Sequence, residues 1–396
     1  MSGFKSGAKW RGFESPKPAL PAIGFQGEDS MAKILDSTTL RRELHPLAEI
    51  GLNVKNTCAY VMAKLEEIGL KPHRVGDTYG VVAYIDSGVP GPVIALRADM
   101  DALAFEKDGK PVAIHACGHD SHMAMLLEAA SRLIGHVKRG KVKLVFQPAE
   151  ETLEGAQALI KEGILDDIDI MVGAHGRPVQ DLKAGTLCAS VNHSASGSVV
   201  VKIQGKSAHA ARPHLGVNAL EVAVSVINAV AQIHMDPAQV WSIKPTQMHS
   251  DDGALNIIPS TATVTFDFRG QTNELMTSLI EKLNRLFKNV PEGCGATATW
   301  EYSVICPAAN LDPDVTEELA ECIRETAGED KLAPACGGGG EDFHFYKLAK
   351  PEMKNGYFGV GTGVTPGLHK INMTMDDTLL PMGAAVFERF VLKHLG

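Results

Sequence analysis

The amino-acid sequence predicts an α/β fold, in which a mixed, mainly parallel sheet with helices on both faces is interrupted by a smaller α+β domain. Three observations predict this fold. Apolar strand-like runs alternate with helix-like segments over residues 31–190. Between about residues 191 and 305, the strand-like runs instead alternate apolar and polar side chains, as half-exposed antiparallel strands do. After Pro307 the first pattern returns and continues to the last residue.

The first part of the chain carries the elements of the larger sheet. The segment PVIALRADM is an almost continuous apolar run, which is typical of a strand buried on both faces of a parallel sheet. Other segments show helical spacing of apolar residues, and Gly69 ends the first of these. We expect strands at 80–85, 92–100, 141–151 and 168–175, and helices at 31–70, 120–135 and 155–163.

The middle part of the chain is expected to form the smaller domain. Its strands alternate in polarity, and its first helix has Leu220, Val224, Ile227 and Ala231 on one face. This predicts an antiparallel sheet with two helices on one face, inserted in the larger domain. We expect strands at 198–205, 240–248, 260–268 and 296–304, and helices at 215–234 and 273–288. The predicted divisions are an extension at 1–30, a larger domain formed by 31–190 and 306–396, and a smaller inserted domain at 191–305.

Composition narrows the class of protein. The chain has 396 residues and a net charge of −9 without a basic run, so we expect neither nucleic acid nor a membrane surface as a partner. It has no apolar stretch long enough to span a membrane, and residues 1–30 lack the apolar core of a signal peptide. The seven cysteines are scattered and form no CxxC pair. This pattern argues against a disulfide framework and predicts a reducing compartment, the cytoplasm.

Polar side chains cluster where the predicted parallel strands end. Asp99 ends one strand, Glu150-Glu151 another and His175 a third, while Cys117 and His119 precede a helix. His369 follows a strand-like run near the C-terminus. Each residue alone could be an ordinary hydrogen-bonded polar side chain. Because open α/β sheets form their sites at the carboxyl ends of strands, the convergence of thiol, imidazole and carboxylate groups instead predicts a divalent metal site.

The adjacent pair Glu150-Glu151 is informative. Two neighbouring carboxylates repel each other, and burying both is costly unless a cation is present or one takes a proton. We expect Glu151 to bind metal and Glu150 to hold the proton taken from an attacking water; the alternative is a solvated turn before a helix. Cys117 lies just ahead of a helix N-terminus and near several histidines, which favours its thiolate.

Further candidates lie in the smaller domain. The segment GKSAHAARPH places His209 and His214 in a loop between a strand and a helix, although an ordinary polar turn would look the same. Arg269 ends a strand and Asn256 sits in NIIP. A guanidinium and an amide are suited to holding a substrate carboxylate. A surface ion pair and a satisfied turn amide are the alternatives.

Four consecutive glycines, Gly337 to Gly340, precede Glu341-Asp342. They permit a tight turn or a close approach of backbone to a ligand. The run lacks the lysine and serine of a phosphate-binding P-loop, so we do not expect a nucleotide site.

These motifs resemble those of the dinuclear-metal aminoacylase/carboxypeptidase amidohydrolases. The most similar branch holds hippurate hydrolases, N-acetyl-diaminopimelate deacetylases, indole-acetyl-amino acid hydrolases and p-aminobenzoyl-glutamate hydrolase. The resemblance covers about residues 32–396, and HACGHD with FQPAEE is its most specific part. The matching motifs, in order, are RADMDAL (97–103), HACGHDSHMAM (115–125), FQPAEE (146–151), GAH (173–175), GKSAHAARPH (205–214), NIIP (256–259), EDF (341–343) and LH (368–369).

The resemblance implies a role for each matching residue. Glu150 would be the general base, Asp99 would orient a ligand, and His209 would steady the oxyanion, often in the partner subunit's site. Asn256 and Arg269, with His214, would hold the substrate. Two divalent ions per subunit are implied, manganese or zinc foremost, with cobalt and nickel also compatible. The implied metal ligands are Cys117, His119, Glu151, His175 and His369.

Two departures from the family pattern bear on the acyl group that is recognised. Many relatives have a longer stretch, with a proline, where this chain has the short AFEKDGKPVAI (104–114). In addition, DFRG (267–270) differs from the GTxR of many relatives and is more similar to the p-aminobenzoyl-glutamate branch. Both changes would reshape the pocket and leave the metal ligands intact.

The resemblance implies a metal-dependent hydrolase that cleaves the amide bond of small N-acyl or N-aroyl amino acids. The resemblance also implies that residues 31–190 and 306–396 form the catalytic domain and residues 191–305 a lid and dimerisation domain. The substrate would be a small carboxylate-bearing amide, and the enzyme would be a homodimer or higher homo-oligomer through the lid domain. Two alternatives remain at this point. One is a metal-dependent deaminase of an aromatic amine on the same site, and the other is a relative that binds a carboxylate without catalysis.

Overall fold

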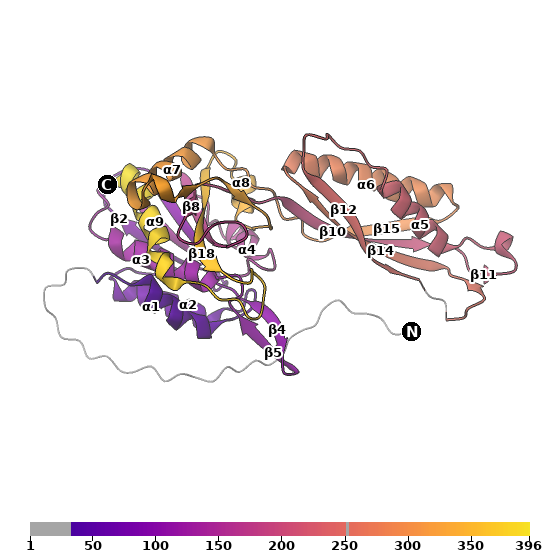
Figure 1. The fold of residues 1–396 in the computed structure, drawn as a ribbon, viewed down its shortest axis with the longest axis horizontal. Helices are drawn as coiled ribbons and strands as arrows, with labels where there is room; N and C mark the ends of the chain where they lie inside the picture. Colours follow the sequence, from indigo (N-terminus) through magenta and orange to yellow (C-terminus); the bar gives the residue numbers. More distant parts are fainter. Residues whose placement is uncertain (1–32, 251–252) are drawn as a thin grey trace.

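The structure is a computed structural model that describes residues 33–250 and 253–396. The predicted extension at residues 1–30 lies outside the described residues. A large mixed sheet with its helices forms one unit, and a smaller antiparallel sheet with two helices lies beside it (Figure 1). No helix among the described residues is both long and apolar enough to cross a membrane.

The large sheet has eight strands, and its centre is parallel. β6, β3, β7 and β18 run parallel to one another, whereas β1, β2 and β8 join through antiparallel pairings. This confirms the predicted mixed, mainly parallel sheet. In sheet order the strands are β1 (His73–Arg74), β2 (Val81–Asp86), β6 (Lys141–Gln147), β3 (Val93–Asp99), β7 (Ile170–Pro178), β18 (Lys354–Val364), β8 (Leu187–Cys188) and β16 (Leu332–Ala333).

Helices cover both faces of this sheet, because its central strands are apolar on both faces. In β3, Ile94 and Leu96 join the core under one helical layer, and Ala95 joins the core under the other. The first layer consists of α1 (Ser37–Leu44), α2 (Lys55–Glu67), α3 (His119–Leu133), α7 (Pro313–Ala327) and α9 (Leu380–Leu395). The second consists of α4 (Gly155–Lys161) and α8 (His344–Ala349).

β18 is the last strand in the sequence, yet it lies inside the sheet between β7 and β8. Its pairing with β7 runs from Lys354 opposite Ile170 to Val364 opposite Pro178. Most of its side chains are buried. The middle of the large sheet therefore depends on a segment near the C-terminal end of the chain.

Residues 195–302, which we call the insert, form the smaller unit. Its four strands are antiparallel in the order β12-β14-β10-β15, and Phe266 and Phe287 contribute to a core beneath α5 and α6. This confirms the predicted antiparallel sheet with two helices. The elements are β10 (Ala195–Gln204), α5 (Ala219–Val230), β12 (Trp241–His249), β14 (Thr261–Gly270), α6 (Asn273–Gly293) and β15 (Thr297–Tyr302).

Several short ladders complete the fold. β9 (Val191–Asn192) pairs with β17 (Cys336–Gly337), where the chain enters the insert and after it has returned. β11 (Ala208–His209) pairs with β13 (Ile257–Ile258) within the insert.

A hairpin that the sequence did not predict follows β3. Its strands are β4 (Leu103–Lys107) and β5 (Lys110–Ile114), which pair antiparallel around Asp108 and Gly109. Asp108 and Gly109 have left-handed backbone, as a tight hairpin turn requires. The segment was missed because its strands are short and at most half-buried, although the Asp108-Gly109 pair was an available signal for a two-residue hairpin turn.

Several predicted boundaries were wrong, among them the end of helix 273–288, which continues to Gly293, and two of the errors have clear local reasons. β6 ends at Gln147 rather than at residue 151, because Pro148 follows and Ala149 has a left-handed φ of 57°. α5 begins at Ala219 rather than at residue 215, because the side chain of Asn218 caps it by accepting from the Leu220 N–H.

Candidate functional site

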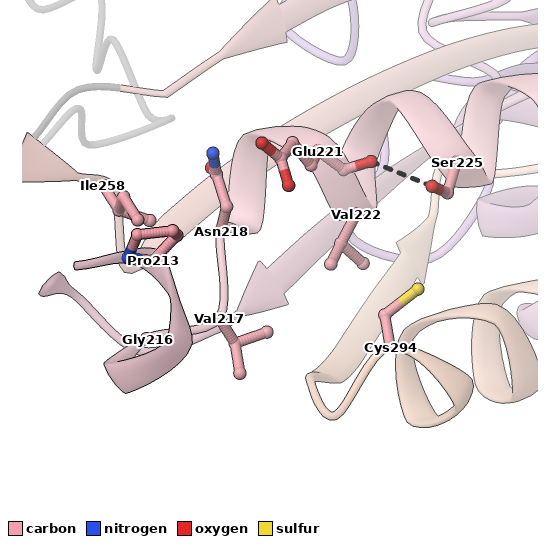
Figure 2. Close-up of a pocket in the computed structure, with 9 residues that line it drawn as sticks. All are labelled: Pro213, Gly216, Val217, Asn218, Glu221, Val222, Ser225, Ile258 and Cys294. Carbon is pink, nitrogen blue, oxygen red and sulfur yellow. Dashed lines mark hydrogen bonds between the residues drawn. The ribbon is translucent and has the colours of Figure 1, made fainter. Parts of the chain in front are cut away.

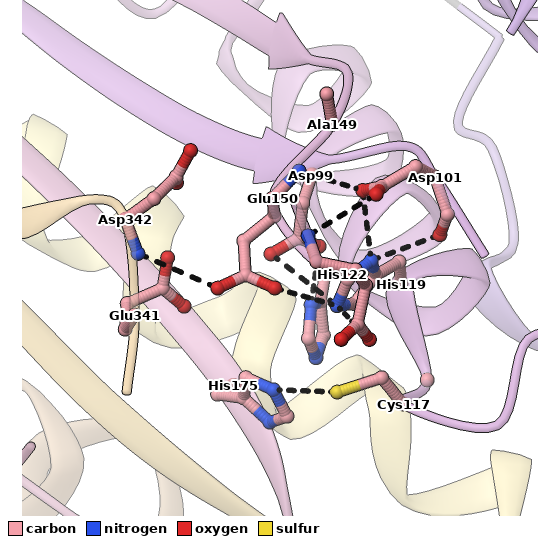
Figure 3. Close-up of polar contacts among 12 residues, drawn as sticks. Asp99, Asp101, Cys117, His119, His122, Ala149, Glu150, His175, Glu341 and Asp342 are labelled. Carbon is pink, nitrogen blue, oxygen red and sulfur yellow. Dashed lines mark hydrogen bonds and ion pairs between the residues drawn. The ribbon is translucent and has the colours of Figure 1, made fainter. Parts of the chain in front are cut away.

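The candidate site lies at the edge of the large sheet where the parallel strands β6, β3 and β7 lie side by side. Asp99 ends β3, Glu150-Glu151 follow β6, and His175 belongs to β7. Cys117 lies just before α3 and His119 is its first residue. Figure 3 shows the side chains of Cys117, His119, Glu150 and His175 turned toward one centre. The fold thus brings together residues from four separate stretches of sequence.

Unusual backbone shapes this centre. Gly118, between Cys117 and His119, has a φ of 91°, which lets the chain turn so that both neighbours face the cluster. Ala149 and His369 also have left-handed φ values, of 57° and 59°, although neither is glycine. Such conformations are strained for residues with a Cβ and concentrate at functional sites.

The five predicted metal ligands and Glu150 lie close together. The Cys117 Sγ is 3.4 Å from the His175 Nε2, and the His369 Nε2 is 3.6 Å from a carboxylate oxygen of Glu151. The His369 side chain is 56% exposed, so the cluster opens to solvent on that side. Three groups with ligand atoms all within 4.8 Å of one another contain these residues: Cys117, His119 and His175; Cys117, Glu151 and His369; and His119, Glu150 and Glu151.

Two buried histidines of the cluster are oriented by backbone carbonyls. The His119 Nδ1 lies 2.9 Å from the Asp101 carbonyl oxygen, and the His175 Nδ1 lies 2.6 Å from that of Gly176. When each Nδ1 donates to its carbonyl, each Nε2 keeps a free electron pair that faces the cluster. This is the arrangement that a metal-binding imidazole requires.

Two buried polar atoms of the cluster have no hydrogen-bond partner among the described residues. They are the His119 Nε2 and the Glu151 Oε1. Leaving such an atom without a partner costs about 1–3 kcal/mol, more for a charged group. Because both atoms are electron-pair donors next to the Cys117 thiol, the set fits a divalent cation of the zinc or manganese type.

The pKa values of the acidic groups in the cluster are shifted in the direction expected when negative charge is buried without a cation. Burial raises the pKa of Glu150 well above its ordinary value, and Glu341 and Glu151 raise it further. Burial also raises the pKa of Glu151. Burial and then Glu151 raise the pKa of Cys117, so the expectation that its surroundings favour a thiolate is wrong for the protein groups alone. A cation within the cluster would reverse this balance.

Asp101 connects both halves of the cluster. One carboxylate oxygen accepts the Glu150 N–H at 3.0 Å and the other accepts the Glu151 N–H at 3.2 Å, while its carbonyl faces His119. Asp101 lies within the RADMDAL motif, and no role was predicted for it. Its position two residues beyond Asp99, at the same strand end, was the available signal.

Asp99 lies deeper in the protein than its predicted role as ligand orienter suggests. Its carboxylate accepts from the His122 Nδ1 at 2.7 Å and from the Arg97 Nη1 at 2.7 Å. His122, which the sequence analysis also left without a role, accepts the Gly176 N–H at 2.9 Å through its Nε2. His122 therefore links the Asp99 carboxylate to the backbone of β7 through hydrogen bonds. The Asp99 carboxylate is 3.9 Å from the His119 Nε2.

A second set of carboxylates adjoins Glu150. Glu341 and Asp342 lie with it in a group whose ligand atoms are all within 4.8 Å, and the Asp342 N–H donates to a Glu150 carboxylate oxygen at 3.4 Å. The buried Arg97 pairs with Asp342 at 2.8 Å and with Glu341 at 3.1 Å, which offsets their charge. The loop that carries both residues thus reaches the predicted base.

The predicted residues of the insert lie apart from this cluster within one chain. The His209 Nε2 is 3.4 Å from the Asn256 Nδ2, and β11, which carries His209, lies at the end of the insert farthest from the large sheet (Figure 1). His214 is exposed in a short turn at the same end. Arg269 lies at the opposite end of β14 and pairs with Asp267 at 3.2 Å. The structure therefore brings Asn256 to His209 but not to Arg269.

The insert also has a groove of about 300 Å³ next to the N-terminus of α5 (Figure 2). Asn218, Glu221, Ser225 and Cys294 supply its polar lining. None of the predicted site residues lines it, and no metal-binding group of the described residues lies there. The chemistry of the chain is therefore concentrated at the sheet edge rather than in this groove.

Comparisons with known proteins agree with this arrangement. The family model of peptidase family M20/M25/M40 matches residues 95–393. The chain is 33% identical over 368 residues to the N-acetyl-L-cysteine deacetylase of Bacillus subtilis, covering 86% of this chain and 84% of that protein. It is 28% identical over 372 residues to the hippurate hydrolase of Campylobacter jejuni, covering 90% of this chain and 96% of that protein.

The fold has close counterparts among solved structures. A dinuclear metal binding peptidase of the M20 family from Bacillus subtilis superposes with a TM-score of 0.76 at 25% identity, covering 91% of this chain and 97% of that one. The predicted family and the predicted enzyme class, a hydrolase of amide bonds, are confirmed. From the matched region, the full-length relatives and the shared architecture, we conclude that this chain belongs to peptidase family M20/M25/M40.

Proposed function

We propose that the protein is a metal-dependent amidohydrolase that cleaves the amide bond of small N-acyl or N-aroyl amino acids, releasing a carboxylic acid and an amino acid. The observation that carries this proposal is the buried cluster of thiol, imidazole and carboxylate groups with Glu150 beside it. The names of two relatives, a deacetylase of N-acetyl-L-cysteine and a hydrolase of hippurate, support this substrate class. The unpaired cysteines support the cytoplasm as its compartment.

We assign the metal ligands to the predicted set. The free electron pairs of His119 and His175 and the unpartnered oxygen of Glu151 support the assignment. Two divalent ions, manganese or zinc foremost, would supply Lewis acidity toward water and toward the amide carbonyl. The ligands would be Cys117, His119, Glu151, His175 and His369.

Glu150 would move the protons of the reaction. Its backbone is held by Asp101, and the Asp342 N–H donates to one of its carboxylate oxygens, which leaves the other facing His119 at 3.8 Å. From this position the carboxylate would take a proton from the attacking water and then deliver it to the nitrogen of the leaving amino acid.

The insert would hold the substrate and complete the site between two chains. In one chain β11 points away from the cluster, so we propose that His209 steadies the oxyanion in the partner chain of a homodimer, with Asn256 and His214 beside it (Figure 1). Arg269 is opposite Ser196, at the end of the insert that adjoins the large sheet. We therefore assign Arg269 to the substrate carboxylate in its own chain.

Replacing His209 with alanine is expected to lower kcat by about 10²-fold, because one donor to the oxyanion is lost. Metal content should stay at the wild-type value, since His209 lies far from the proposed ligands. Steady-state kinetics and elemental analysis of the same preparation measure both quantities. Loss of metal or of the folded state would instead make His209 a structural residue.

Mixing two inactive variants tests whether His209 acts across the interface. A dimer of one Glu150→Gln chain and one His209→Ala chain would have one intact site if His209 serves the partner. After subunit exchange at equal amounts, activity is expected to reach about a quarter of wild type. A mixture as inactive as its components would assign His209 to its own chain.

Replacing Asp101 with alanine is expected to weaken metal binding by about 10–100-fold, the usual effect of losing a group that orients ligands. The N–H groups of Glu150 and Glu151 would both lose their acceptor. Competition with a metal-binding dye measures the affinity. Asp108→Asn, a charge change at the exposed hairpin tip, is the matched control and should bind metal as wild type does. Equal metal affinity of wild type, Asp101→Ala and Asp108→Asn would contradict the role of Asp101.

The substrate class is tested with a panel of N-acetyl, N-benzoyl and longer N-acyl amino acids, offered to protein loaded with manganese, zinc or cobalt. Release of the free amino acid is the expected result, and the preferred acyl group would define the pocket beside the hairpin 103–114. Ammonia is measured in parallel. Release of ammonia without an amino acid would replace the proposal with a deaminase.

A further inference from the structure

Two cysteines far apart in the sequence face each other beneath the loop that carries Glu341. Cys188 belongs to β8 and Cys336 to β17, and their Sγ atoms are 3.4 Å apart. No hydrogen bond joins either sulfur to a proposed metal ligand within the described residues. The fold therefore places two of the seven cysteines side by side, although they are 148 residues apart in the sequence.

We propose that Cys188 and Cys336 form a modification site that hydroperoxides convert to a disulfide. The Cys336 sulfur attacks one peroxide oxygen and becomes a sulfenic acid, while the other oxygen leaves as water or an alcohol. The Cys188 sulfur then attacks the sulfenic sulfur, forms the S–S bond and releases the sulfenic oxygen as water. The two thiols lose two electrons and two protons, and the peroxide gains them.

The surroundings of Cys336 make it the attacking thiol. A hydrogen bond from Cys188 lowers the pKa of Cys336 to about 7, with burial opposing this shift and the positive charge of Arg177 assisting it. Arg177 also donates to the Gly337 carbonyl at 2.9 Å, which fixes the guanidinium beside this segment. A thiol with a pKa near neutrality is a thiolate often enough to react with peroxide.

Access favours the same residue. Cys336 is 9% exposed and is followed by four exposed residues, Gly337 to Gly340, whereas Cys188 is fully buried. The oxidant would therefore reach Cys336 first, and Cys188 would act as the resolving thiol. Because the resolving thiol already lies in contact, oxidation would stop at the disulfide.

Closing the bond requires movement, and the structure indicates which side moves. The sulfurs must approach from 3.4 Å to about 2.05 Å. Cys188 is opposite Gly359 on one side and opposite Ala333 on the other, and its Sγ lies 3.3 Å from the Ser190 carbonyl oxygen. Cys336 leads instead into the glycine run, where Gly338 and Gly339 have φ values of 96° and 77° and open space around them. The backbone movement that brings the two sulfurs together would therefore displace the glycine run, Gly337 to Gly340.

The run ends at Glu341 and Asp342, so the disulfide would act on the active site. Asp342 donates to Glu150 through its N–H, and both acidic residues pair with Arg97. This part of the inference rests on the proposed function. Since a displacement of about 1 Å can cost up to 10²-fold in rate, we expect the disulfide to lower kcat on the order of tenfold.

The test uses metal-loaded, full-length protein treated with hydrogen peroxide and, separately, with diamide, which oxidises thiol pairs. Peptide mass mapping without reduction should find a Cys188–Cys336 disulfide and a loss of the mass of two hydrogen atoms. Cys188→Ser and Cys336→Ser should each prevent it, and Cys188→Ala serves where serine disturbs the buried site. Cys294→Ser, which removes the exposed cysteine of the insert, is the matched control and should cross-link as wild type does.

Activity is measured on the same samples. The kcat of oxidised wild type is expected to fall and to recover after dithiothreitol, while Cys188→Ser keeps its starting kcat under diamide. If Cys188 and Cys336 both remain free thiols after folded wild-type protein is treated with peroxide or diamide, the proposal is overturned. A complete disulfide with unchanged kcat would overturn the coupling to Glu150. Inactivity of every sample before oxidation would concern the proposed function alone, because mass mapping does not depend on turnover.

Discussion

Glu150→Gln is expected to lower kcat by about 10²–10⁴-fold while the protein keeps its fold, because an amide cannot accept the proton of the attacking water. The substituted side chain keeps the shape of Glu150 and can still accept the Asp342 N–H. The Michaelis constant should change little, since Glu150 is proposed to act on the reacting atoms rather than on substrate binding. Steady-state kinetics on metal-saturated protein measure both parameters.

The matched control for this substitution is Glu154→Gln, which makes the same change at an exposed position in the same turn. It should retain the wild-type kcat. Elemental analysis must show equal metal content in the three proteins, so that a loss of turnover is not a loss of metal. Near-normal turnover in metal-loaded Glu150→Gln would remove Glu150 from the role of base.

Removing divalent metal is expected to abolish amide hydrolysis. Reloading the protein with metal is expected to restore it. The Glu151 Oε1 has no hydrogen-bond partner among the described residues, and the pKa of Glu150 is raised by burial and by Glu341. Dialysis against a chelator, followed by titration with manganese, zinc, cobalt or nickel, should recover activity with about two ions per chain. The melting temperature should rise with the metal concentration, because a ligand that binds only the folded state stabilises it.

Substitutions of single ligands sharpen this test. Cys117→Ser and His175→Ala should each reduce the number of bound ions and eliminate most turnover. His45→Ala, at a partly exposed histidine outside the proposed ligand set, is the control and should bind metal as wild type does. Full activity of metal-free wild type, verified by elemental analysis, would contradict the whole assignment.

The fold class was accessible from the sequence because its strongest signals are long and regular. The run that forms β3 is apolar on both faces, and the strands of the insert alternate, so each pattern indicated its kind of sheet. The hairpin 103–114 was missed because its strands are short and at most half-buried, although Asp108-Gly109 is typical of a two-residue hairpin turn. The end of β6 was also missed, although Pro148 was an available signal; the left-handed φ of Ala149 is the part that its residue type does not predict.

The sequence predicted which residue types form the candidate site. It did not predict which of these residues contact one another. The spacing of Cys117 and His119 and the adjacency of Glu150 and Glu151 indicated metal chemistry. No pattern could show that Asp101, rather than Asp99, supports both glutamates, because that depends on which carboxylate turns toward the loop after β6. Likewise, the separation of Arg269 from Asn256 follows from the length and direction of β14, which one-dimensional spacing does not contain.

The position of β18 inside the large sheet has a consequence for biosynthesis. The ribosome releases residues 354–364 only after the rest of the sheet and the whole insert have been made, so β7 and β8 must wait for the strand that lies between them. The insert, residues 195–302, has its own apolar core and all of its strands by then. Nascent chains would therefore carry a folded insert beside an open sheet with two unpaired edges, and this is the stage at which chaperones would be most needed.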